Sequence, residues 1–382
     1  MSTTRVGPLI AVLAIAASAA AVAVSAQIPA QVEIRVPKAP TVAVFGAGAF
    51  AVYELHVTNV STDTITLQRL EVVDGSGGKT LLTAQDSVLL TALSRPGTPM
   101  PRDRRARVDP GLRAVIFVWL PVDAQHPPAT LRQRISLRKS GADSASQVLD
   151  GGLVRVEAHP VAIGAPLRGE WMAANGPSNA SGHRRSAIAT NGTIAIAQRF
   201  AIDFVRVDSA GSSFRGDRSK NENFYAEGQD ALAVADGIVV ETKDSIPENT
   251  EGPASRAVPI TLVTVGGNHV VVDIGHGRYA FYAHVKPGSL RVHVGDRVKR
   301  AQVLALVGNT GNSTEPHLHF HISDSLASGT STLGSEGLPY TLPSFDVVGH
   351  CTIVTEIKCS RAMPVTVRGA MPMENEIVRF PK

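Results

Sequence analysis

The stretch Pro316–His321, with the sequence PHLHFH, places three histidines at alternate positions in an otherwise apolar run. Such a run predicts a β-strand, in which alternate side chains point to the same face. His317, His319 and His321 are therefore expected to line one side of a strand. Imidazole is the commonest protein ligand for metal ions and the usual general acid or base near neutral pH. The alternative is a surface strand that happens to be rich in histidine.

Further short strands are predicted on the N-terminal side of this stretch. A strand over residues 267–273 is followed by a turn and a second strand that ends at His284. Residues 292–299 and 303–308 predict two more strands, and the loop Asn309–Thr314 (NTGNST) leads into the histidine-rich strand. This pattern predicts a β-rich domain around the histidines.

A hairpin is predicted around Asn191 and Gly192, followed by one strand over residues 194–203. The even positions of this strand are mostly apolar and are expected to be buried. The odd positions carry small residues together with Arg199 and Asp203, which suits the floor of a cleft.

Residues 199–322 resemble the lysostaphin-type (LytM-domain) zinc metalloendopeptidases, which cut peptide bonds in bacterial peptidoglycan. The resemblance is carried by elements that follow one another in the family's order: Tyr282-Ala283-His284, V-x-x-G-D-x-V over 292–298, Gly308–Ser313 and His317–Phe320. It implies a compact antiparallel β peptidase domain, the duplicated hybrid motif, with the site in a groove.

The resemblance also implies roles for individual residues. Asp203 and His319 would bind Zn²⁺, and His284 and His317 would be catalytic imidazoles that orient and deprotonate a zinc-bound water and stabilise the oxyanion formed on attack. Zinc suits this reaction because three protein ligands leave a fourth position open and the metal lowers the pKa of bound water towards ~7.

One position departs from the family pattern. Arg199 stands four residues before Asp203, where the family has its first zinc-binding histidine, and arginine stays protonated and cannot bind zinc. We predict that His183 supplies the third ligand. A three-residue hairpin loop over 191–193 would pair His183 with Ala201, on the face of Asp203, whereas a two-residue loop would turn His183 away. The alternative is that His183 is a loop residue at the groove rim.

Two residues are predicted to contact substrate. Arg199 would hold a substrate carboxylate with two hydrogen bonds, or else would pair with Asp203 and block the metal site. His321, where the family often has Glu, is expected at the rim of the groove. His269 is expected to be a surface or turn histidine.

The chain is predicted to have four parts: a signal peptide over 1–26, a β-sandwich over 27–160, a LytM-like metallopeptidase domain over 161–345 and a C-terminal tail over 346–382. Alternating apolar residues such as Tyr53, Leu55 and Val57, separated by turn clusters, favour an immunoglobulin-like sandwich. This domain carries no catalytic cluster, so a spacer, inhibitory or binding module is expected. Residues 158–176 read as a linker.

The N-terminal apolar, alanine-rich run and its small-residue end predict a cleaved signal peptide and hence a secreted or periplasmic protein of the bacterial cell envelope, with no membrane contact after cleavage. An uncleaved anchor is the alternative. Cys351 and Cys359, the only two cysteines, predict one disulfide. The mild net charge of +4 and few aromatic residues do not favour nucleic-acid binding.

The fold class is therefore all-β. The expected function is a zinc endopeptidase acting on peptidoglycan peptides. The alternative is a catalytically degenerate LytM-like module that binds cell wall or regulates another hydrolase, with that hydrolase as its partner.

Overall fold

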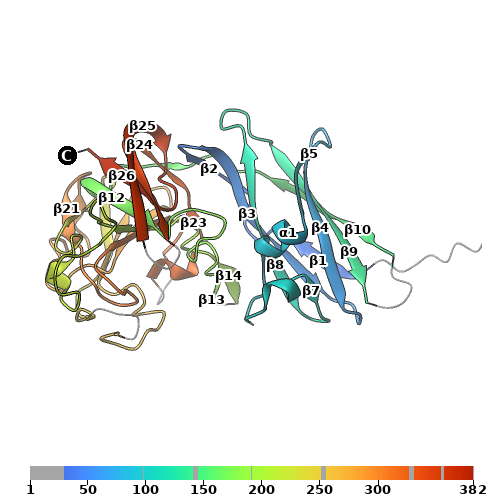
Figure 1. Ribbon diagram of the computed structural model, residues 1–382, viewed down its shortest axis with the longest axis horizontal. Helices are drawn as coiled ribbons and strands as arrows, with labels where there is room; N and C mark the ends of the chain where they lie inside the picture. Colours follow the sequence, from blue (N-terminus) through green and yellow to red (C-terminus); the bar gives the residue numbers. More distant parts are fainter. Residues whose placement is uncertain are drawn as a thin grey trace, which may run out of the picture.

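The computed structural model describes residues 30–381 apart from 98, 141–144, 191, 251–254, 327–330 and 354–356, so the predicted signal peptide lies outside the described residues. Figure 1 shows two β-rich lobes side by side, the N-terminal lobe in blue to cyan and the other in green through red. The predicted all-β class is confirmed, and α1 (Asp86–Ala92) is a short helix that the sequence pattern did not indicate. Among the described residues, no helix has the length and apolar character to cross a bilayer.

The N-terminal lobe consists of two sheets that face each other. Its strands are β1 (Val32–Arg35), β2 (Thr41–Phe45), β3 (Gly48–Asn59), β4 (Ile65–Asp74), β5 (Thr80–Gln85), β6 (Leu93–Ser94), β7 (Arg107–Val108), β8 (Arg113–Val122), β9 (Thr130–Lys139) and β10 (Gln147–Arg155). One sheet has the order β1-β3-β8-β6 with β2 beside β3, and the other has the order β10-β9-β4-β5 with β7 beside β4. The core between them includes Tyr53, Leu55 and Val57, as their alternation predicts.

Strand β3 is buried on both faces. Glu54 and His56, which alternate with the core residues and would face water in an isolated sandwich, are also buried. The reason is that the second lobe covers the other face of this sheet, where Phe45 and Val52 join a core made mostly of second-lobe residues. The two lobes therefore share one apolar core at their junction.

The second lobe is built around a long sheet. Its strands are β11 (Val161–Ala162), β12 (Gly169–Ala174), β15 (Ile202–Val205), β17 (Gly237–Lys243), β18 (His269–Asp273), β19 (Tyr279–Ala283), β20 (Arg297–Val298), β22 (Leu318–Ser323), β23 (Gly337–Leu338), β24 (Tyr340–Ile353), β25 (Ile357–Ala370) and β26 (Glu376–Phe380). The order is β11-β24-β26-β12-β15-β22-β19-β18-β17-β20, with β23 beside β22 and β25 beside β24. Two small pairs lie apart from it, β13 (Ile188–Thr190) with β14 (Thr193–Ala195) and β16 (Asp230–Leu232) with β21 (Val303–Leu306).

Two segments differ from the expected domain plan. The expected tail over 346–382 is part of the long sheet, because β24 and β26 hydrogen-bond within it and β25 adds to β24. The expected linker over 158–176 contains β12, which lies between β26 and β15. The predicted Cys351–Cys359 disulfide is present and joins directly opposed residues of β24 and β25.

The strand predicted over 194–203 is interrupted. β14 ends at Ala195, a turn follows in which Arg199 donates its backbone N–H to Ile196 and Ala201 donates to Gln198, and β15 begins at Ile202. The predicted hairpin register is also wrong, since Thr190 pairs with Thr193 across a two-residue loop. The alternation of apolar residues did not reveal the turn because residues on both sides of it are buried.

Candidate metal centre

Three neighbouring strands of the long sheet form the floor of the candidate site. In the antiparallel register, Asp203 of β15 lies opposite His319 of β22, and His319 lies opposite Ala283 of β19. Residues directly opposite each other in neighbouring strands point to the same face. The carboxylate Oδ1 of Asp203 is consequently 2.9 Å from Nδ1 of His319, and both side chains are buried.

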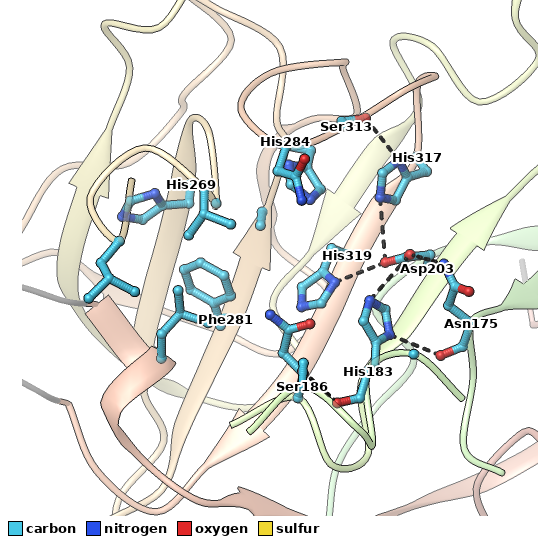
Figure 2. A pocket seen from close by; sticks show the side chains of 18 of the residues that line it. Asn175, His183, Ser186, Asp203, His269, Phe281, His284, Ser313, His317 and His319 are labelled. Carbon is cyan, nitrogen blue, oxygen red and sulfur yellow. Dashed lines mark hydrogen bonds and ion pairs between the residues drawn. The ribbon is translucent and has the colours of Figure 1, made fainter. Parts of the chain in front are cut away.

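His183 reaches the same point from a turn outside the sheet. Ser186 donates its backbone N–H to the carbonyl of His183, which closes this turn. Nδ1 of His183 lies 2.9 Å from the carbonyl oxygen of Asn175, and Nε2 lies 3.4 Å from Oδ2 of Asp203 (Figure 2). Because Nδ1 can donate to that carbonyl, Nε2 is left with a lone pair directed at the Asp203–His319 pair.

His317 directly precedes β22, the strand that carries His319. Its Nδ1 is 2.8 Å from the carbonyl oxygen of Glu315 and its Nε2 is 3.4 Å from Oδ1 of Asp203. Figure 2 shows its ring above Asp203, directed at the carboxylate. The side chain is therefore oriented by one nitrogen, and the other faces the site.

His284 directly follows β19 and adopts a left-handed backbone conformation, with φ of 64°. Its Nδ1 lies 2.7 Å from the carbonyl oxygen of Thr310, and its ring centroid is 4.7 Å from that of His317. Glycines at 267 and 311 permit the chain to approach Thr310, because a Cβ at either position would overlap backbone atoms across this contact. The loop Asn309–Thr314 thus serves to orient His284.

Charges within the site shift the pKa values of its members in different directions. Burial raises the pKa of Asp203, but the imidazoles of His183 and His317 outweigh it and hold the pKa well below its usual value. Burial lowers the pKa of His317, yet attraction to Asp203 and hydrogen bonds to Asp203 and Glu315 raise it overall. Burial, reinforced by repulsion from His317 and His319, holds the pKa of His284 well below its usual value. The ionised carboxylate and a neutral His284 are the states favoured near neutral pH.

A cavity of about 500 Å³ opens over these residues. Asp203, His183, His284, His317 and His319 all line it. A further part of its wall is apolar and is formed by Ile188, Leu262, Val263, Val265, Phe281 and Leu333. The cavity therefore combines a polar, titratable floor with an apolar wall, as binding sites for organic ligands do.

Arg199 and His321 lie elsewhere than predicted. Arg199 is buried and its guanidinium pairs with Glu54 of the N-terminal lobe and with Glu336, so neither a substrate contact nor the alternative pairing with Asp203 describes it. His321 is fully buried and not at the rim, because its ring packs against Phe281 and beside His319. His269, expected at the surface, is buried and lines the cavity.

Several residues that hold the site together were not anticipated. Asn175 holds His183 through its carbonyl and donates from Nδ2 to Oδ2 of Asp203 over 2.9 Å. Nδ1 of His321 lies 3.0 Å from Nε2 of His319. The Asn-Gly pair at 175–176 signals a turn, but no sequence pattern connects that turn to a strand end nearly thirty residues later.

His183, Asp203 and His319 form a set that can hold a metal ion. One ligand atom from each residue lies within 4.8 Å of the others. A tetrahedral zinc site with bonds of about 2.0–2.1 Å places its ligand atoms roughly 3.3 Å apart, so small side-chain adjustments suffice. In each of the two histidines, the ring nitrogen that faces away from Asp203 is hydrogen-bonded: Nδ1 of His183 to Asn175 and Nε2 of His319 to His321. This is the usual arrangement of metal-bound histidine.

Comparison with known families identifies this part of the chain. Residues 222–330 match the model of peptidase family M23. This range contains His284, His317, His319 and the loop that orients His284, so the predicted resemblance to lysostaphin-type (LytM-domain) peptidases is confirmed for this domain. The chain contains an M23-type domain, and this match supports a metallopeptidase role.

Individual relatives agree with the family match over short ranges. An uncharacterized metalloprotease of Buchnera aphidicola is 30% identical over 95 residues, which are 25% of this chain and 20% of the relative. An uncharacterized metalloprotease of Haemophilus influenzae is 38% identical over 73 residues, which are 19% of this chain and 15% of the relative. This chain therefore spans about a fifth or less of the length of these relatives.

Among solved structures, the catalytic domain of lysostaphin from Staphylococcus simulans is similar at 23% identity. The match covers 42% of this chain and 85% of the lysostaphin domain, with a TM-score of 0.23.

Proposed function

We propose that this protein is a zinc metalloendopeptidase that hydrolyses peptide bonds of bacterial cell-wall peptidoglycan in the periplasm or outside the cell. The observation that carries the proposal is the convergence of His183, Asp203 and His319 on one point beside two further imidazoles at the floor of an open cavity. The family match over residues 222–330 supports the same reaction class.

The donor set fits zinc. Two imidazoles and one carboxylate are ligands that Zn²⁺ prefers, and three protein ligands are typical of catalytic zinc sites. When bound, zinc supplies a Lewis acid and a water molecule of lowered pKa. His183, Asp203 and His319 would hold the ion, and all three line the cavity.

The two remaining imidazoles serve proton transfer and charge stabilisation. His284 donates from Nδ1 to the carbonyl of Thr310, so its Nε2 is an acceptor, and its lowered pKa keeps the ring unprotonated and free to accept a hydrogen bond or a proton. His317 has a raised pKa, which favours a protonated ring able to donate a hydrogen bond to developing negative charge. An imidazole pair with opposite pKa shifts suits a general base and an electrophilic partner.

A measurement of zinc content and peptide cleavage tests this function. The purified chain is expected to bind one zinc ion and to release new amino termini from muropeptides, and His319→Ala is expected to lose both properties. Wild-type protein without zinc, or with zinc but indifferent to His319→Ala, would contradict the proposal.

The absence of the family's first ligand favours one second candidate, a LytM-like module that binds cell wall or regulates another hydrolase. Arg199 occupies that position and pairs through Nη1 and Nη2 with the carboxylates of Glu54 and Glu336. This candidate predicts binding to peptidoglycan without release of amino termini, whether or not zinc is bound.

A further inference from the structure

A buried carboxylate of the N-terminal lobe lies between two arginines of the second lobe. Glu54, in the middle of β3, accepts from Nη1 of Arg184 through Oε1 over 2.6 Å and from Nη1 of Arg199 through Oε2. All three side chains are almost completely inaccessible to solvent. Buried charges are retained only where they are paired, so Glu54 fixes both guanidinium groups in position.

Arg184 directly follows His183 in the chain, and its other donors are also bound to the N-terminal lobe or to its own loop. Nη2 donates to the carbonyls of Tyr53 and Val118, at 3.0 and 2.9 Å, and Nε donates to Oδ1 of Asn179 at 3.1 Å. Tyr53 and Val118 are opposed residues of β3 and β8. The guanidinium is therefore docked onto the face of one sandwich sheet.

Two neighbouring residues attach the same loop to the same sheet. Asn179 donates from Nδ2 to the carbonyl of Phe117 over 3.0 Å, and Arg185 stacks over the Phe117 ring and donates to the carbonyl of Thr91. His183 is the residue of this docked turn whose ring points into the cavity. The sandwich thus anchors the turn that carries the His183 imidazole, and the Asn175 carbonyl orients the ring.

The second arginine connects this docking to the missing ligand. Arg199 stands at the position where the histidine of the resembling family would bind zinc, and Glu54 and Glu336 hold its guanidinium away from the cavity lining. One carboxylate therefore keeps the cation at 199 out of the site and anchors the turn that carries His183 into it.

We propose that Glu54 is a positioning residue of the metal centre, so that the N-terminal sandwich completes the ligand set by holding His183. This inference rests on the proposed metal site. It assigns the N-terminal lobe a direct part in metal affinity, in place of a spacer or inhibitory role.

The test is a zinc titration of the full chain with Glu54→Gln and its matched control Glu336→Gln. Both variants remove one carboxylate from Arg199, but only Glu54 also contacts Arg184. Glu54→Gln is expected to weaken zinc affinity roughly 10–100-fold, the range observed when partners that orient metal ligands are lost. Glu336→Gln is expected to retain the affinity of the wild type. With Co²⁺, the absorption spectrum of Glu54→Gln should approach that of His183→Ala.

The outcomes separate this inference from the proposed function. Unchanged affinity in Glu54→Gln, together with weakened binding in Asp203→Ala, would overturn the positioning role alone. Unchanged affinity in Asp203→Ala and His319→Ala would overturn the metal site itself. If Glu54→Gln fails to fold, as judged by near-ultraviolet circular dichroism, Asn179→Ala decides. It removes an uncharged anchor of the same turn, and it is expected to weaken zinc binding, whereas unchanged affinity would contradict the inference.

Discussion

At the scale of single residues, the carboxylate of Asp203 is shared by imidazoles from two separate segments. His319 reaches it from β22 and His317 from the position directly before β22, and His183 reaches it from the docked turn. Each of these rings has its second nitrogen hydrogen-bonded, to Glu315, His321 and Asn175 respectively. Such contacts fix the tautomer and the direction of the remaining lone pair. These contacts therefore orient the free nitrogen of each ring toward Asp203.

His183→Ala is expected to lower zinc affinity by more than about 100-fold, because two protein ligands hold zinc poorly. Isothermal titration with Zn²⁺ measures this change. His293→Ala, at a histidine whose side chain is 92% exposed, is the matched control and should bind zinc as the wild type does. Equal affinities in the two variants would remove His183 from the ligand set.

His321→Ala is expected to weaken zinc binding about tenfold, because Nε2 of His319 loses its hydrogen-bond partner. His321→Gln offers a carbonyl oxygen at a similar place and should recover most of the affinity. Competition with a chromophoric chelator gives both constants. If Ala and Gln variants bind alike, the contact does not orient His319.

The sequence predicted the parts of the site that depend on strand geometry. The alternation of His317 and His319 in an apolar run was sufficient to place them on one face, and the order of motifs was sufficient to identify the domain. The position of His183 followed from a register that the structure does not have. His183 lies beside Asp203 because of contacts with another lobe, and such long-range contacts leave no periodic trace in the sequence.

At the scale of elements, two glutamates of the second lobe, Glu227 in a loop and Glu170 in a strand, lie in unlike electrostatic environments. Glu227, which follows the short 3₁₀ turn η2 (Asn221–Asn223), is mostly buried and accepts from Nζ of Lys286 over 2.6 Å. Burial, together with repulsion from Glu248 and Glu222, raises its pKa to about 7. Glu170 of β12 is different, since it accepts from Arg361 and Arg379 and its pKa is lowered.

This contrast predicts opposite effects of pH on two variants. A carboxyl with a raised native pKa binds its proton more tightly when folded, so the stability that it contributes falls as pH rises from about 4.5 to 7. Glu227→Gln should therefore match the wild type at pH 4 and exceed its unfolding free energy by about 1–3 kcal/mol at pH 8. Urea denaturation at both pH values measures the difference.

Glu170→Gln serves as the control of opposite sign. Because the pKa of Glu170 is lowered in the folded protein, the stability that its ionised carboxylate contributes is present above the pKa of the unfolded state. This stability is lost in acid. The substitution should lower stability at pH 8 and have less effect in acid. A Glu227→Gln effect that is the same at both pH values would show that folding does not shift the pKa of this carboxyl.

The prediction of one strand over residues 194–203 failed because it ran through a buried turn. Ala195, Ala197 and Ala201 are all buried, so small buried residues continue through the turn between β14 and β15. Small residues fit both a strand facing a cleft and a turn packed against a neighbour. Arg199 was the one signal in this segment, and its partner Glu54 is far away in the sequence.

At the scale of the whole molecule, the two lobes are joined by apolar packing as well as by Glu54. Phe45 of β2 stacks on Trp119 with ring centroids 5.5 Å apart and belongs to the core that includes Trp171 and Phe345 of the second lobe. A parallel bridge also joins Phe45 to Met371. The lobes are therefore expected to unfold together.

Phe45→Ala is expected to lower the unfolding free energy by about 3–5 kcal/mol, as for other large buried aromatic residues. Chemical denaturation followed by tryptophan fluorescence measures the loss. Met363→Ala, at an apolar residue that is 84% exposed, is the control and should change stability little. A similarly small loss for Phe45→Ala would show that the junction contributes little to folding.

The position of β26 in the long sheet has a consequence for biogenesis. β26 lies between β24 and β12, and β12 is in turn the neighbour of β15, which carries Asp203. During synthesis, β12 and β15 leave the ribosome long before residues 376–380 do, and β12 lacks one of its two neighbours until then. The sheet that carries Asp203 is therefore complete only after residues 376–380 have been synthesised.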